Sequence, residues 1–195
     1  YDTISTLLAI HDRGASLILL SHLLQHNSLF LSYVFSRSDL EIIILPLLRV
    51  MYSATEAQAI YTVDHVLLVS VILLIFTQDK AFVLHSQHHK VTSVLWYKEH
   101  TLSDISIADL ISTILLRVLS VNLTKFKDQV LQVNGMAILV NMSAHFEKMD
   151  SHTAHRLIAL LDLLSRRYFK WKENHADLEK NETIPENTNP IDIQK

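Results

Sequence analysis

Three histidines form the pattern in this sequence that comes nearest to a metal-binding motif. His85, His88 and His89 follow the order His-x-x-His-His, and on one helix this spacing places His85 beside the other two. Imidazoles bind zinc, so a histidine-based metal-binding protein or enzyme is one interpretation. However, no cysteine or carboxylate completes the ligand set, and 12 of the 195 residues are His, so such clusters arise easily. We therefore predict no metal and no cofactor, with an exposed helix end or loop as the simpler interpretation of this cluster.

Other catalytic motifs do not occur in the sequence. The chain has no Cys, which excludes disulfides, thiolate metal sites and cysteine nucleophiles. It contains no His-Glu-x-x-His, Gly-x-Ser-x-Gly or P-loop pattern. Its two glycines, Gly14 and Gly135, are too few to build a loop that cradles phosphate. The sequence thus predicts a protein that is not an enzyme.

Asn141 is the candidate contact for a partner protein. It lies in the string Ala-Ile-Leu-Val-Asn-Met-Ser, which is similar to the third helix of an armadillo repeat. In such repeats an Asn faces a concave groove, where its amide can both donate to and accept from the backbone of a partner. The alternative is an Asn bonded to a nearby loop carbonyl. Gly135, near the start of the same helix, either costs about 1 kcal/mol relative to Ala or permits the close approach of a neighbouring helix.

A basic and aromatic segment stands near the end of the last predicted helix. Its members are Arg166, Arg167, Tyr168, Phe169, Lys170, Trp171 and Lys172. Of these, Arg166, Arg167, Lys170, Trp171 and Lys172 are the candidate surface for an anionic membrane, because amphipathic rings and basic side chains favour that interface. The alternative is that cations gather at a helix C-terminus, where the helix dipole is negative. Binding of nucleic acid is not predicted, because the net charge is −3 and no basic stripe occurs elsewhere.

The composition predicts an all-α protein. Gly and Pro number only 2 and 3, whereas together they usually make up roughly 12% of a chain. Sheets joined by tight turns rely on such residues. The chain is 49% apolar and 19% charged, which is typical of a folded segment. The longest apolar run, Val66–Phe76, is too short to cross a bilayer and indicates a buried helix.

Periodicity and capping signals divide the chain into a succession of helices. Residues 1–172 form the predicted folded part, and residues 173–195, with six acidic and two basic side chains, form a predicted disordered polar tail or linker. Ser38 with Glu41 and Thr101 with Asp104 have the spacing of helix caps. Pro46 is expected to kink or break the helix in which it lies. The predicted elements are Asp2–Ile10, Ala15–His26, Leu29–Phe35, a helix opened by Ser38 and ending near Tyr52, Ala59–Phe76, Lys80–Gln87, an element at Val91–Tyr97, and helices at Leu102–Asn122, Lys127–Phe146 and Ser151–Trp171.

The faces of these helices indicate stacked layers. Leu40–Met51 and Val63–Phe76 are apolar on nearly every side, so both must be covered all round. The last helix instead has a one-sided stripe of Leu157, Leu160, Leu161 and Leu164. Alternation of two-sided and one-sided helices predicts an α-solenoid of helical hairpins, like armadillo or HEAT repeats, rather than a simple four-helix bundle.

Three blocks of the sequence resemble an internal segment of the dymeclin family. They are Leu19–Leu48, Leu73–Ile105 with the strings LLIFTQD and WYKEHTLSDIS, and Asn122–Leu164 with NGMAILVNMSAHF and AHRLIALLDLLS. The resemblance implies an armadillo-like solenoid without catalytic residues, acting through protein partners as a scaffold in Golgi organisation and vesicle trafficking. It also implies exchange between the cytoplasm and the Golgi membrane, with membrane contact mainly through an N-terminal region that this sequence does not include.

Overall fold

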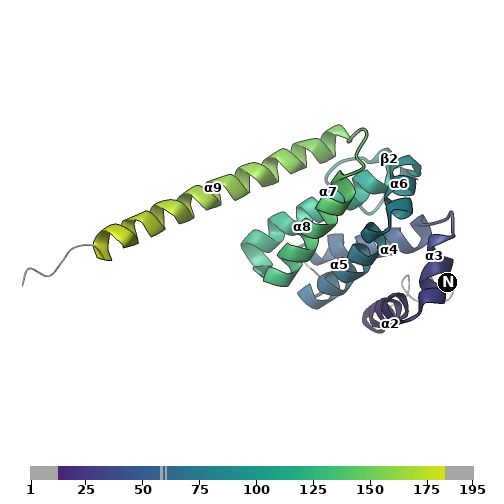
Figure 1. Ribbon diagram of the computed structural model, residues 1–195. Helices are drawn as coiled ribbons and strands as arrows, with labels where there is room; N and C mark the ends of the chain where they lie inside the picture. The colour runs from purple at the N-terminus through teal and green to yellow at the C-terminus, as the bar shows by residue number, and fades with distance from the viewer. Residues whose placement is uncertain (1–12, 58, 60, 183–195) are drawn as a thin grey trace, which may run out of the picture. The chain divides into compact units, whose positions relative to one another are not determined.

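The computed structural model describes residues 13–57, 59 and 61–182, and most of these residues are helical (Figure 1). The predicted helix Asp2–Ile10 lies outside the described residues. The chain divides into two compact units, Tyr1–Leu157 and Ile158–Lys195. The elements are α2 (Arg13–His26), α3 (Ser28–Phe35), α4 (Glu41–Ala54), α5 (Val63–Gln78), α6 (Lys80–His88), β1 (Lys90–Ser93), β2 (Ser103–Ser106), α7 (Ile107–Val121), the short π-helix η1 (Asn122–Phe126), α8 (Gln129–Ser143) and α9 (Ser151–Glu182).

Helix α7 is the centre of the first unit. Nearly all of its residues are buried, and it packs against α4, α6 and α8. Together with η1 it is long and apolar enough to cross a membrane, but 72% of its most apolar window is buried inside the protein, as is usual for a core helix. Helices α5 and α6 reach the length and apolar character of a membrane span only when taken together, and they are bent by 96° relative to each other. The sequence prediction of a buried helix at Val66–Phe76 is confirmed, since α5 buries most of the side chains on this run.

Two pairs of consecutive long helices stack on each other in this unit. Helix α4 packs on α5, and α7 packs on α8. Between the pairs, α4 contacts α7 while α5 lies beside α8 (Figure 1). Helix α2 adds a further layer on α5 and also contacts α3. Each long helix is therefore covered by neighbours from its own pair and from the next, which explains why α4 and α5 carry apolar residues on more than one side.

Gly135 permits the close packing of α8 on α7. A Cβ atom at this position would lie 2.6 Å from Leu119 Cδ2 and 3.1 Å from Leu119 Cγ, and Leu119 is fully buried. Of the two roles considered for Gly135, the structure therefore supports the close approach of a neighbouring helix.

A β-hairpin occupies the region where the sequence predicted an element at Val91–Tyr97 and the start of a helix at Leu102. Strands β1 and β2 are antiparallel, with Lys90 opposite Ser106 and Val91 opposite Ile105. Helix α7 begins only at Ile107, so the predicted cap of Thr101 with Asp104 is wrong. Ser106 caps the helix instead, because its hydroxyl oxygen accepts the backbone N–H of Asp109 at 3.0 Å.

Two local predictions for α4 concern its start and its proline. The residue that precedes the helix is Leu40, without a side-chain cap, so the predicted capping pair of Ser38 and Glu41 does not form. The helix continues from Glu41 to Ala54 with Pro46 inside it rather than breaking there. Pro46 removes one backbone hydrogen bond, and burial of neighbours such as Leu47, which is fully buried, outweighs that loss.

Helix α9 extends beyond the predicted end of the folded part. It runs to Glu182, ten residues past Lys172 (Figure 1). No Pro or Gly interrupts residues 173–182, and the first proline of this region is Pro185. Residues 173–182 are therefore helical, while residues 183–195 lie outside the described part of the chain.

Candidate interaction sites

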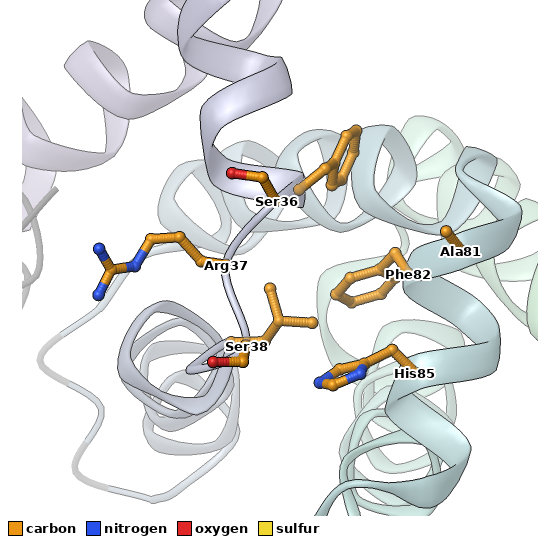
Figure 2. A pocket seen from close by; sticks show the side chains of 8 residues that line it. Ser36, Arg37, Ser38, Ala81, Phe82 and His85 are labelled. Carbon is orange, nitrogen blue, oxygen red and sulfur yellow. The ribbon is translucent and has the colours of Figure 1, made fainter.

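A pocket of about 310 Å³ lies between α6 and the connection from α3 to α4. Figure 2 shows Phe82 and His85 directed into it from α6, whereas the guanidinium of Arg37 points away. Phe35 and Leu40 add to its apolar lining. His85 Nε2 is buried there and has no hydrogen-bond partner. The lining is thus mixed, since Ser36 and Ser38 accompany the apolar side chains, and His85 Nε2 is a buried polar atom within it.

The three histidines of the His-x-x-His-His pattern do not converge on one point. His85 lines the pocket, His88 is exposed at the end of α6, and His89 Nε2 lies 2.9 Å from Glu41 Oε2. The rings of His85 and His89 are 5.5 Å apart between centroids. Within residues 13–57, 59 and 61–182, no group of three His, Asp or Glu side chains is arranged to hold a metal ion. Each histidine therefore has its own surroundings rather than a shared ligand position.

Asn141 contacts the neighbouring helix α5. Its amide nitrogen donates to Thr77 Oγ1 at 3.3 Å. Seven residues earlier, Asn134 donates to Ser70 Oγ at 3.2 Å in the same way. The two Asn residues are two turns apart on α8, and their two acceptors are two turns apart on α5. The same contact therefore repeats along the interface between α5 and α8. The amide N–H of Asn141 is therefore used within the fold, and its role as a contact for a partner stays a prediction.

Glu99, in the loop of the β-hairpin, is the centre of a polar cluster that the sequence analysis did not find. Its two carboxylate oxygens form ion pairs with Arg117 of α7 and Arg156 of α9. The Tyr97 hydroxyl donates to Glu99 Oε2 at 3.2 Å. Because two guanidinium groups hold this carboxylate, it is suited to joining elements and unsuited to acting as a free base.

Arg117 connects this cluster to α4. Its Nε donates to Thr55 Oγ1 at 2.6 Å, and its guanidinium lies 4.9 Å from the ring centroid of Tyr52. The Tyr52 hydroxyl accepts the backbone N–H of Lys98 at 3.2 Å. The hairpin loop is therefore fixed to α4 as well as to α7. No sequence motif indicates this arrangement, because Arg117 is 62 residues from Thr55 and Lys98 is 46 residues from Tyr52 along the chain.

Two titratable groups of this cluster have shifted pKa values: burial raises the pKa of Tyr97, and the pKa of His152 is lowered. Arg156 Nε always carries a proton, and it donates to His152 Nε2 at 3.1 Å, so Nε2 is the unprotonated nitrogen of the neutral ring. Burial lowers the pKa of His152, and the stacked ring of His100, 5.2 Å away, lowers it further, while Asp150 opposes the shift. The neutral imidazole is thus the form that fits this position.

The basic and aromatic segment lies within α9 rather than at its end. Tyr168, Phe169 and Trp171 are 58%, 61% and 56% exposed. Arg166 pairs with Asp162 across one helical turn at 2.9 Å. Since the helix continues to Glu182, placement of these cations at a C-terminal dipole does not account for them. Their role at an anionic membrane stays a prediction.

These features are those of an all-α protein. The described chain is built mainly from stacked helices, its polar clusters join elements, and its large unpartnered apolar side chains lie on exposed helix faces. Comparison with known families then identifies the group. The family model for dymeclin, the Dyggve-Melchior-Clausen syndrome protein, matches residues 2–191, and the chain belongs to this family.

Individual relatives agree with this assignment. The chain is 36% identical to dymeclin from Dictyostelium discoideum over 158 residues, which is 81% of this chain and 16% of the relative. It is 35% identical to the Xenopus laevis protein over 153 residues, 78% of this chain and 22% of the relative. For the Drosophila melanogaster protein the identity is 30% over 168 residues, 86% of this chain and 23% of the relative. The chain thus spans about a sixth to a quarter of these relatives, and no solved structure matches it.

Proposed function

We propose that this chain is a non-enzymatic helical scaffold within a peripheral Golgi-associated protein of the cytoplasm. Its contribution to Golgi organisation and vesicle trafficking would be made through contacts with other proteins. Membership of the dymeclin family is the observation that carries this proposal. Two features of the structure support it: the polar clusters are used to join helices, and large apolar side chains stay exposed on α8 and α9.

The same proposal includes an α-solenoid of the armadillo or HEAT kind. Helical pairs that stack first helix on first helix and second on second are the unit from which solenoids are built. The contacts of α4 with α7 and of α5 with α8 have this order. A cryo-electron microscopy structure of the complete parent protein tests the idea. Continuation of such pairs along the chain is expected, whereas a closed bundle made from these helices alone would contradict it.

Localisation of the parent protein is the experiment that tests the cellular role. A fluorescent tag on the full-length protein, viewed with a Golgi marker, should show overlap that disperses when Golgi membranes are dispersed. Capture of partner proteins from Golgi-enriched extracts by the wild-type chain then follows. A diffuse cytosolic or nuclear signal would contradict the Golgi role and leave the helical fold unchanged.

A further inference from the structure

Helix α9 carries an apolar seam with the spacing of a coiled coil. Leu161, Leu164, Tyr168, Trp171 and His175 follow one another at intervals of three, four, three and four residues. In the sequence, the same alternation includes Leu157 before this set and Leu178 after it. An average interval of 3.5 residues keeps a stripe facing one partner helix along its length. We call the five residues from Leu161 to His175 the α9 seam.

The side chains of the seam share one face, and all of them are exposed except Leu164, which is half-buried. The rings of Tyr168 and Trp171 are 6.3 Å apart and stacked, and those of Trp171 and His175 are 4.1 Å apart. Leu161, Tyr168 and Trp171 are each more than half exposed. Large rigid aromatic side chains of this kind are enriched among the residues that dominate binding at protein interfaces.

Basic side chains border the seam on both sides. With Tyr168 and Trp171 at the two apolar heptad positions, Arg167 directly precedes one and Lys172 directly follows the other, so they occupy the two flanking positions. No acidic residue lies three or four positions from either of them in the sequence. Their charges are therefore not neutralised along the helix.

These flanks decide which helix can occupy the seam. A second copy of α9, parallel or antiparallel, would place Arg167 and Lys172 against each other or against themselves, and like charges at these positions disfavour pairing. A helix with acidic residues at the same positions would form attractive pairs in either direction. Residues 158–175 carry four basic and two acidic side chains, which adds to this preference.

We infer that the α9 seam is a docking site for an amphipathic helix of a partner protein, with an apolar heptad stripe bordered by Glu or Asp. The partner's apolar side chains insert between those of the seam, and its carboxylates meet Arg167 and Lys172. This assignment deepens the proposed scaffold function, on which it rests, by giving one contact surface and the chemistry of its partner.

Two synthetic peptides test the inference with the full 195-residue chain. Both contain three heptads with Leu at the two apolar positions, one with Glu at every flanking position and the other with Lys. Fluorescence anisotropy of the labelled peptides at about 50 mM salt is expected to show at least tenfold tighter binding of the Glu peptide. The difference should shrink as salt rises, because exposed charges are screened. Equal binding of both peptides, or binding of neither, would overturn the inference.

Charge-reversed variants give the matched control. Arg167→Glu with Lys172→Glu changes the flanks, and Arg166→Glu with Lys170→Glu changes the net charge equally but away from them. Circular dichroism confirms that each variant stays helical. The first double variant is expected to prefer the Lys peptide, whereas the second keeps the preference for the Glu peptide. If both double variants lose the preference for the Glu peptide to the same extent, the inference fails.

Two further measurements cover the other occupants of the seam. Vesicles of phosphatidylcholine with phosphatidylserine test a membrane, and sedimentation velocity tests a second copy of the chain. Vesicle binding without peptide binding would contradict the inference and assign the seam to a membrane. A dimer that excludes the Glu peptide would contradict it and assign the seam to a second copy of the chain. Golgi localisation of the parent protein is a separate readout, so failure of the docking site and failure of the proposed function can be told apart.

Discussion

Glu99 shows how a single side chain joins separate parts of the first unit. Arg117 and Arg156 approach its carboxylate from two different helices, and Tyr97 donates to it from the same loop. Removal of such a carboxylate would leave two guanidinium groups close together without a counter-charge, which is more costly than the loss of one exposed ion pair. The cluster thus makes the packing of the hairpin loop dependent on charge.

His152 gives this cluster a dependence on pH. Its pKa is lowered from 6.5, mainly by burial and then by His100, with His155 adding a smaller effect and Asp150 opposing it. Below pH 6.5, His152 therefore binds a proton more readily in the unfolded chain than in the folded chain. The free energy of unfolding consequently falls as the pH falls. Above pH 6.5 this contribution is constant.

The variant His152→Gln tests this dependence, because it keeps a polar side chain without a titrating ring. Urea unfolding at pH 7.5, 6.5 and 5.5 should show a smaller loss of stability toward acid for the variant than for the wild type. The other histidines are common to both proteins and cancel in the comparison. Parallel stability curves would show that His152 does not contribute.

Gly135→Ala should destabilise the protein although Ala is the better helix former. Intrinsic helix propensity favours the substitution by about 1 kcal/mol. However, the new Cβ would lie 2.6 Å from Leu119 Cδ2 in the buried contact between α7 and α8. Overpacking of this kind costs about 1–3 kcal/mol, so we expect a net loss of about 1 kcal/mol in urea unfolding. Gly14→Ala is the control, since its Cβ would lie 3.4 Å from His65 Nε2, and it should not destabilise. Equal effects at the two sites would contradict the packing argument.

At the scale of elements, the contact between α5 and α8 is a repeated polar seam. Asn134 and Asn141 donate to Ser70 and Thr77 at equivalent positions two turns apart. Such pairs within an otherwise apolar contact fix the register of one helix on the other, because a shift along the axis would leave the amides without partners.

A double-mutant cycle at one of these pairs separates a structural role of Asn141 from a role only in binding a partner. Asn141→Ala and Thr77→Val should each lower the free energy of unfolding by about 1 kcal/mol, with a coupling of about 0.5–1.5 kcal/mol between them. The measurement is urea unfolding of the two single variants and the double variant. Unchanged stability of Asn141→Ala would favour a contact with a partner over the contact seen with α5.

The elements also show how far the sequence alone could predict the fold. The positions of α5, α6 and α8 follow from local periodicity, and they are close to the predicted ranges. The β-hairpin was missed because its stability depends on pairing Val91 with Ile105 and on contacts of its loop with α4 and α7, which no local pattern records. The Glu99 cluster was missed for the same reason. Ser106 with Asp109 has the same spacing as Thr101 with Asp104, so spacing alone could not select the true cap.

At the scale of the whole chain, the first turns of α9 belong to the fold of the first unit. The hydroxyls of Thr153 and Thr113 are 2.7 Å apart, and both residues are fully buried. The backbone N–H of Asp150 donates to Asp109 Oδ1 at 3.0 Å. With the ion pair of Arg156 and Glu99, these contacts fix the start of α9 to α7 and to the hairpin loop.

Two truncated chains test the importance of these contacts. A chain that ends at residue 149 loses all of them, so the Thr113 hydroxyl and Asp109 Oδ1 lose the partners that they have in the structure. A chain that ends at residue 164 keeps these contacts. Each buried polar group left unpaired costs about 1–3 kcal/mol. We therefore expect the shorter chain to melt about 10 °C below the longer one in a thermal scan by circular dichroism. Equal melting temperatures would show that the first unit is complete without α9, and the Glu99 cluster would then be an accessory to the fold rather than part of its support.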